Sequence, residues 1–201
     1  MSKKTEESRN AYNKIASEYD TSREGQYTRF HINELYKIID LRDGDIVLDV
    51  ACGNGTLLKE LSGKAKIQAY GIDISENMIQ VAKMRYPNIN FTVRPCYPLE
   101  WSDESIDIVT ICCAFHHFDN PQGFANECKR VLKKNGTLYV ADPNFGAVLR
   151  FFANKFWFPL SKSGDVKVYS IKEMVSFFSN CGFKIINAYR KDIGLFLKAK
   201  K

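Results

Sequence analysis

Between Asp45 and Ala141, short runs of β-branched and other apolar residues alternate with stretches in which apolar residues recur at helical spacing. The apolar runs predict five strands, over residues 46–50, 66–73, 89–94, 106–114 and 136–142. Helices are predicted after the first strand as far as Leu61, from Ser75 to about Tyr86, and from Pro121 onward. Strands that are apolar on both faces and alternate with helices are typical of a parallel sheet covered on both sides. We therefore predict an α/β fold whose ligand lies beyond the carboxyl ends of the strands.

The C-terminal part continues this pattern with one more helix and a hairpin. Ser170 and Glu173 have capping-box spacing, and Gly182 is placed to end the helix after Cys181. The segments KIINAYR and IGLFLKA are predicted to pair around Lys191 and Asp192. With 201 residues, the chain is expected to be one domain. We divide it into N-terminal helices at about 1–40, a core at about 44–142, an insertion at about 144–165, and the final helix and hairpin at about 170–199.

Composition and charge narrow the class of protein. Apolar residues at 45% and charged residues at 26% exclude collagen-like and disordered chains. The net charge is +6, and residues 144–201 alone carry eleven basic and three acidic residues, so the rest of the chain carries −2. This asymmetry fits an anionic substrate, a nucleic acid or a membrane surface, although charges dispersed in this way favour a solvated basic face.

Cysteine use and hydropathy indicate a cytoplasmic protein. The six cysteines show no C-x-x-C spacing, and the polar start MSKKTEESRN lacks the apolar centre of a signal peptide. We therefore expect reduced thiols. The richest apolar stretch, LRFFANKFWFPL, contains Arg150 and Lys155 and is too short to span a bilayer.

The end of the first strand carries the most informative motif. In VLDVACGNGTL, Asp49, Gly53 and Gly55 stand between a strand and a helix, so the backbone can approach a ligand closely. Asp73 follows Gly55 by 18 residues and ends the second strand, where its carboxylate can accept both hydroxyls of a ribose. The two features together predict a nucleoside site.

Two cofactor classes share this arrangement. A dinucleotide site requires a small third residue in G-x-G-x-x-G/A, but that position is Leu58. Asp49 would also repel a pyrophosphate and attract an ammonium group. The pattern therefore favours S-adenosylmethionine over NAD.

The segments VLDVACGNGTL, GIDISENMIQVAK and LEWSDESIDIVTICCAFHHFDNP resemble the class I S-adenosylmethionine-dependent methyltransferases, in particular the ubiquinone and menaquinone methyltransferase branch. YNKIASEYD is similar to the N-terminal helix of that family, and YSIKEMVSFFSNCGF to its last helix and strand. The resemblance implies a Rossmann-like fold with a seven-stranded, mostly parallel sheet, helices on both faces and an antiparallel last strand.

The resemblance also implies roles for individual residues. Asp49, Ala51, Gly53 and Gly55 would surround the methionine part of the cofactor, and Asp73 would hold its ribose. The remaining cofactor-binding residues it implies are Tyr19, Ile74, Met78, Cys96, Tyr97, Cys113 and Ala114. For Ile74 and Met78, packing in the core explains their spacing equally well. Pro95 departs from the family, which usually has an acidic residue there to accept from the adenine amino group, so Cys96 and Tyr97 must compensate or binding is weaker.

His116 and His117 follow the fourth strand, where an acceptor would meet the sulfonium. His117 is the candidate general base and His116 a candidate substrate contact, although both fit an ordinary loop with backbone hydrogen bonds. A metal shared with Cys112 and Cys113 is not expected, because adjacent strand residues point to opposite faces.

The insertion is apolar on more than one side. Read as a helix, it places Phe145, Val148, Leu149, Phe152 and Phe156 on one face, which we expect to pack on the sheet. Phe151, Trp157 and Phe158 fall off that face and are predicted to cover an apolar acceptor pocket. Core packing alone is one interpretation of these residues. Otherwise the second face has three candidate partners: a lipophilic substrate, another subunit in a homodimer, or a membrane surface contacted through Arg150, Lys155 and Lys162.

The sequence thus predicts methyl transfer to an O, N or C atom of a small, aromatic or lipophilic molecule. Three other functions stay open: a nicotinamide oxidoreductase, a non-catalytic S-adenosylmethionine-binding protein, and a nucleic-acid methyltransferase. Leu58 argues against the first. The last has only the basic C-terminal third in its favour and no binding module.

Overall fold

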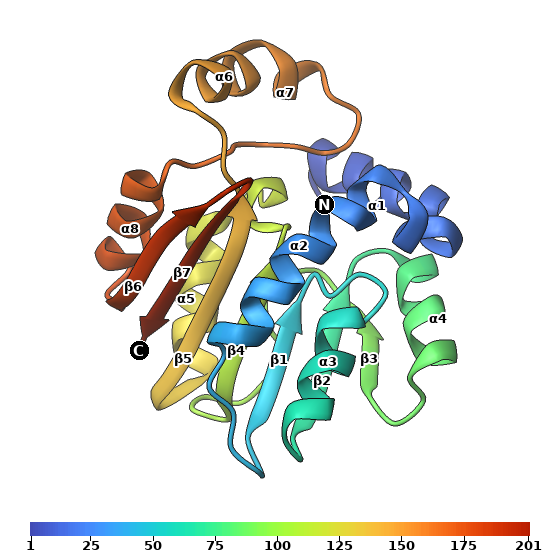
Figure 1. The fold of residues 1–201 in the computed structure, drawn as a ribbon, viewed down its shortest axis with the longest axis vertical. Helices are drawn as coiled ribbons and strands as arrows, with labels where there is room; N and C mark the ends of the chain where they lie inside the picture. The colour runs from blue at the N-terminus through green and yellow to red at the C-terminus, as the bar shows by residue number, and fades with distance from the viewer.

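Seven strands form the single sheet of the computed structural model, which describes residues 1–201 (Figure 1). Their order is β3-β2-β1-β4-β5-β7-β6, and β7 alone runs in the direction opposite to the other six strands. The strands are β1 (Ile46–Val50), β2 (Gln68–Asp73), β3 (Asn90–Val93), β4 (Ile106–Cys112), β5 (Leu132–Pro143), β6 (Lys184–Lys191) and β7 (Gly194–Lys200). The predicted Rossmann-like methyltransferase topology is confirmed, including the antiparallel last strand.

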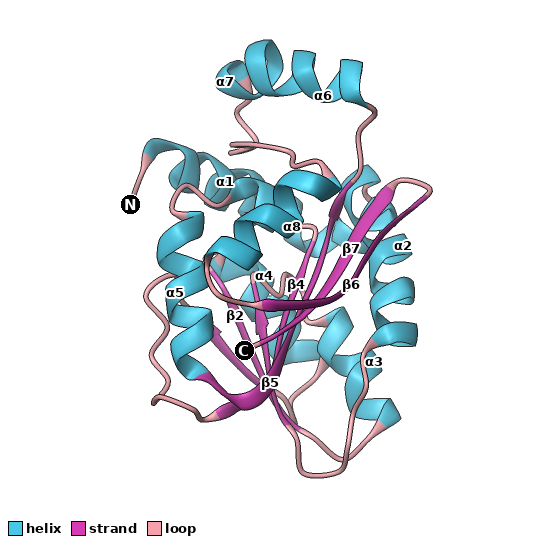
Figure 2. Ribbon diagram, turned by 90° about the vertical axis from the view of Figure 1, so that its left-hand side faces the viewer, coloured by secondary structure: helices cyan, strands magenta, loops and turns pink.

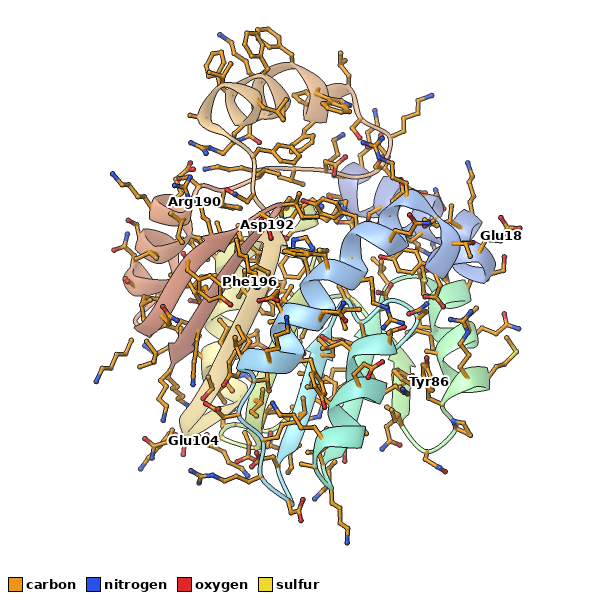
Figure 3. All side chains as sticks on the ribbon, viewed as in Figure 1. Glu18, Tyr86, Glu104, Arg190, Asp192 and Phe196 are labelled. Atoms are coloured by element: carbon orange, nitrogen blue, oxygen red, sulfur yellow. The ribbon has the colours of Figure 1, made fainter.

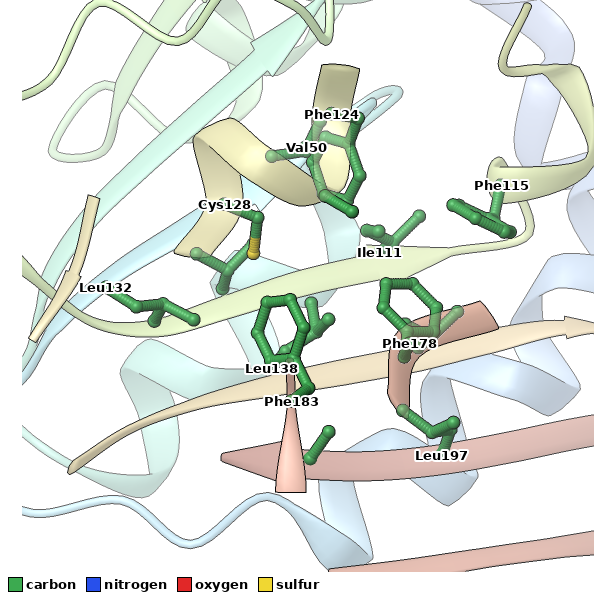
Figure 4. Packing of buried hydrophobic residues seen from close by; sticks show 14 of the residues in the cluster. Val50, Ile111, Phe115, Phe124, Cys128, Leu132, Leu138, Phe178, Phe183 and Leu197 are labelled. Carbon is green, nitrogen blue, oxygen red and sulfur yellow. The ribbon is translucent and has the colours of Figure 1, made fainter. Parts of the chain in front are cut away.

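Helices cover both faces of the sheet (Figure 2). One face carries α2 (Arg23–Ile38), α3 (Thr56–Lys64) and α4 (Glu76–Arg85), and the other carries α5 (Pro121–Val131) and α8 (Ile171–Asn180). Strands serve both layers because successive side chains alternate: Leu48 and Val50 of β1 join the α5–α8 core, and Val47 joins the opposite one. Figure 4 shows the first core, in which Phe124 of α5 and Phe178 of α8 pack over Ile111 and Leu138.

The predicted boundaries hold within two residues except at the end of α3, which runs three residues past the predicted Leu61, and at the start of β5. β4 ends at Cys112 because Cys113 has a φ of 51°, which an extended strand does not tolerate. β5 begins four residues before the predicted Gly136, because Leu132 already pairs with Ile106 directly after α5 ends. The final helix has the predicted capping box of Ser170 and Glu173.

The N-terminal segment comprises α1 (Lys3–Ile15), the 3₁₀ helix η1 (Ala16–Thr21) and α2. At the other end of the chain, Asp192 lies at the tip of the β6–β7 hairpin (Figure 3). The carbonyl oxygen of Asp192 accepts from the Asn144 side chain at 3.2 Å, which ties the hairpin to the start of the insertion. No helix in the structure is both long enough and apolar enough to cross a membrane.

Residues 144–165, called the lid below, form a helical arm above the carboxyl ends of the parallel strands (Figure 1). The lid contains α6 (Ala147–Phe152), the π-helical turn η3 (Ala153–Trp157) and α7 (Phe158–Leu160). The prediction of its packing face was wrong. Phe152 and Phe156 are 53% and 52% exposed, whereas Phe158 is only 6% exposed and packs with Ala153 and Val168. The loop through Val168 is thus the partner of the lid, and the sheet is not.

Candidate functional site

A cavity of about 720 Å³ opens at the carboxyl ends of β1, β2 and β4, beneath α1. This position is the point where the strand order reverses between β1 and β4, the usual ligand crevice of open α/β sheets. Its volume lies within the range of roughly 300–1,000 Å³ typical of small-molecule sites. Ten of the twelve predicted cofactor residues line it: Tyr19, Ala51, Gly53, Asp73, Ile74, Met78, Cys96, Tyr97, Cys113 and Ala114.

Asp73 organises the floor of the cavity. Its Oδ2 accepts from the backbone N–H of Gly53 at 2.8 Å, and its Oδ1 accepts from the N–H of Ser75 at 2.8 Å. Burial raises the pKa of Asp73, while the backbone N–H donors oppose that rise. The carboxylate therefore holds the glycine loop against the start of α4, and each of its oxygens has a lone pair left for a ligand hydroxyl.

The space beside the Gly53 backbone shows whether the glycine loop has room for a ligand. Its φ is +54°, and a Cβ built there would meet nothing within 4 Å, so the space beside its backbone is open. Gly55 has a different reason to be glycine. A Cβ on Gly55 would lie 2.5 Å from the Phe91 ring, so this residue permits packing of the loop on β3.

Gly55 and Asp49 are the two predicted cofactor residues that do not line the cavity. Asp49 sits inside the sheet opposite Thr110 of β4, whose hydroxyl donates to its Oδ1 at 2.6 Å. Burial raises the pKa of Asp49 to about 7, although the bond from Thr110 opposes this shift. Asp49 is only 1% exposed and does not line the cavity, so its contact with the ammonium group of the cofactor stays a prediction.

Two residues with left-handed backbone flank the switch point. Ala51 follows β1 with a φ of 58°, and Cys113 follows β4 with a φ of 51°, and both line the cavity. Such conformations are costly for residues other than glycine and cluster at functional sites. Burial would raise the pKa of the Cys113 thiol, but Cys112 and nearby His31 lower it to about 6.

Helix α1 covers the cavity from above, and the sequence did not predict which residues of this helix do so. Arg9 pairs with Glu76 at the start of α4, and the Asn13 side chain accepts from the Ser75 hydroxyl at 2.6 Å and from the Asn77 N–H at 3.1 Å. Arg9 and Asn13 lower the pKa of Glu76 to about 2. These contacts hold α1 over the cavity. Their only signal in the sequence was the polar character of the segment, because each partner lies more than 60 residues away.

Tyr12 and His117 also line the cavity. His117 belongs to the 3₁₀ helix η2 (Phe115–His117), and its Nε2 lies 3.2 Å from the Tyr12 hydroxyl. Burial and the charge of His116 lower the pKa of His117 to about 3, so the ring is neutral at physiological pH. Its Nδ1 is buried and has no hydrogen-bond partner. Tyr12 was quoted within a family motif but was not predicted as a site residue.

The four predicted substrate contacts do not lie on the cavity wall. His116 turns away, and its Nδ1 lies 2.9 Å from Asp142 Oδ1 in β5. Burial lowers the pKa of His116, but the carboxylates of Asp142 and Asp165 outweigh burial and raise it. Phe151 and Trp157 are 54% and 61% exposed on the lid, and Phe158 is in the lid's own small core. The rings of Phe151 and Trp157 therefore do not line the cavity in this structure. The spacing of apolar residues could not reveal where the fold places these rings.

Residues 48–140 match the family described as a methyltransferase domain. A demethylmenaquinone methyltransferase of Thermotoga maritima is 29% identical over 172 residues, covering 79% of this chain and 75% of the relative. That of Renibacterium salmoninarum is 31% identical over 153 residues, covering 73% of this chain and 64% of the relative. The chain belongs to the class I S-adenosylmethionine-dependent methyltransferases. Its cofactor is S-adenosylmethionine.

Solved structures agree with the fold of this methyltransferase. A putative methyltransferase of Haloferax volcanii, solved with the Trm112 methyltransferase activator, superposes with a TM-score of 0.80 at 18% identity, covering 94% of this chain and 96% of that one. A possible histamine N-methyltransferase of Thermotoga maritima gives 0.72 at 21% identity, covering 96% and 99%. At these identities the likeness shows the fold alone.

Proposed function

We propose that this methyltransferase transfers a methyl group to an aromatic, lipophilic acceptor of the demethylated-quinone type. The cavity carries the proposal, because its wall is mostly apolar and it joins the floor around Asp73 to Tyr12 and His117 in one space. Curated relatives from two organisms methylate demethylmenaquinone according to their names.

The residues of the cavity fit the cofactor. Asp73 would accept the ribose hydroxyls, and the open space beside Gly53 would admit the methionine part. Ile74 and Met78 would pack against the adenine, with Cys96 and Tyr97 closing its edge in place of the acidic residue that Pro95 replaces. When bound, S-adenosylmethionine supplies an electrophilic methyl group on its sulfonium.

The protein's own contribution is alignment and exclusion of water. Helix α1, fixed to α4 through Arg9 and Asn13, closes the cavity from above. Tyr12 and neutral His117 offer hydrogen-bonding groups to an acceptor oxygen. A histidine with a pKa near 3 is a weak base, so His117 is better suited to orient an acceptor than to remove its proton. We therefore propose an acceptor that ionises readily by itself, such as a phenol or hydroquinone.

The test measures release of S-adenosylhomocysteine from a panel of hydroquinones, phenols and amines. We expect turnover with the hydroquinones and a lower kcat/KM in Tyr12→Phe with unchanged cofactor affinity. Cofactor binding without turnover of any acceptor would instead identify a non-catalytic binding protein. Turnover confined to the amines would refute the acceptor class and leave the cofactor site standing.

A further inference from the structure

The outer surface of the lid is the most apolar exposed region of the molecule. Half of the fourteen large apolar side chains that are exposed anywhere in the chain lie between residues 148 and 160. We define the outer face of the lid by six of them, which are 52–84% exposed: Leu149, Phe151, Phe152, Phe156, Trp157 and Leu160. Exposed apolar patches on this scale mark interaction sites.

This face is fixed toward solvent. The inner side of the lid is already occupied, because Ala153 and Phe158 pack against Val168. The Asn154 side chain donates to the Val168 carbonyl oxygen at 2.9 Å and accepts from the Val168 N–H at 2.9 Å. Turning the outer face inward would break this core and both hydrogen bonds, so the face does not pack on the rest of the chain.

The charges around the face select its partner. Residues 144–165 contain Arg150, Lys155 and Lys162 and one acidic residue, Asp165, whose Oδ2 accepts from the Ser161 hydroxyl at 2.7 Å. Lys155 and Lys162 form no ion pair, and the Lys155 ammonium lies 5.3 Å and 5.4 Å from the ring centroids of Phe151 and Phe156. Apolar rings beside unpaired lysines are the pattern of a helix that lies in the interface of an anionic bilayer, with its lysine stems along the apolar surface.

A second copy of the chain is a poorer partner. Two outer faces in contact would bring the unpaired Lys155 and Lys162 of one copy against the same two lysines of the other, which repel each other. Anionic lipid headgroups neutralise the lysines, and the acyl region buries the rings, so a bilayer meets both requirements.

We propose that the lid docks this methyltransferase on the surface of an anionic membrane, through its outer face and its two unpaired lysines. The lid stands over the carboxyl ends of the strands, so docking would bring the end of the sheet that carries the cavity toward the lipid (Figure 1). The proposal goes beyond the methyl transfer itself and does not depend on which acceptor is used.

The test is co-sedimentation of the full chain with vesicles of phosphatidylcholine, with and without phosphatidylglycerol. We expect binding to the anionic vesicles that falls with added salt. Phe151→Ser/Trp157→Ser/Leu160→Ser should lower the partition coefficient at least ~tenfold. The matched control Met84→Ser/Ile186→Ser changes exposed apolar residues away from the lid and should leave it unchanged. Lys155→Glu/Lys162→Glu should weaken binding more than Lys14→Glu/Lys134→Glu.

Trp157 reports the depth of contact directly. Brominated lipids should quench the fluorescence of the chain, and Trp157→Phe, which keeps an apolar ring, should abolish that quenching because Trp101 lies far from the lid. Failure to bind anionic vesicles, or equal binding by the lid and control variants, would overturn the proposal. Concentration-dependent self-association that disappears in the lid variant would overturn it in favour of a second copy. Cofactor affinity, measured on every variant, should stay constant and so keeps this result separate from the methyl-transfer proposal.

Discussion

Replacing the Asp73 carboxylate should affect cofactor binding and folding by separate amounts. In Asp73→Ala, two charged hydrogen bonds to the ribose would be lost, which should weaken S-adenosylmethionine binding by about 2–4 kcal/mol, or roughly 30- to 900-fold. The structure shows that this variant should also lose stability. Ser75 is fully buried, and its N–H would lose the 2.8 Å bond to Asp73. A buried unsatisfied donor costs about 1–3 kcal/mol, so the free energy of unfolding should fall by that amount.

Two measurements separate these effects. Calorimetric titration with S-adenosylmethionine gives the affinity, and urea unfolding gives the stability. Asp73→Asn keeps a single acceptor oxygen and should lie between the wild type and Asp73→Ala in both. Asp45→Ala is the control, because Asp45 also accepts a backbone N–H, from Arg42 at 2.7 Å, but lies at the opposite end of β1. Unchanged affinity in a folded Asp73→Ala variant would refute the nucleoside site.

Three further predictions follow from burial and charge. Phe158→Ala should lower the local stability of the lid by about 3–5 kcal/mol and speed tryptic cleavage at Lys155, because Phe158 is buried in the small core of the lid. Trp157→Ala should change that stability by no more than about 0.5 kcal/mol, because Trp157 is exposed. Equal cleavage rates for the two variants would contradict this prediction. The rate at which iodoacetamide modifies wild type should include a component that rises with pH around a midpoint of about 6 and is missing in Cys113→Ser. A midpoint above about pH 8 would be inconsistent with a stabilised Cys113 thiolate. Burial raises the pKa of Asp49 from 3.8 to about 7, so the stability of wild type should fall by about 4 kcal/mol relative to Asp49→Asn as the pH rises through that window. Unfolding free energies from urea titration that stay parallel for the two proteins across this window would disprove the shift.

Local signals in the sequence were enough to predict the sheet, the helix caps and ten of the residues that line the cavity. The Ser170–Glu173 capping box and the β1 strand with its glycine turn depend on groups a few residues apart, so the amino-acid order specifies them directly. Strands apolar on both faces then require helices on both sides. Asp73 was found for the same reason, because it ends a strand at the carboxyl edge of the sheet, where ligands bind.

The directions in which the residues of the glycine-loop motif and of the lid point were decided only by the tertiary structure. Asp49 and Gly55 belong to the same motif as Gly53, yet Asp49 faces Thr110 of the next strand and Gly55 faces the Phe91 ring, because neighbouring strands occupy those directions. The apolar face of the lid was predicted from its spacing, but spacing cannot say whether a face meets the protein or the solvent. That choice depends on Val168, which fills the inner side of the lid and leaves Phe152 and Phe156 outside. Such contacts join residues far apart in the chain, and only the folded chain brings them together.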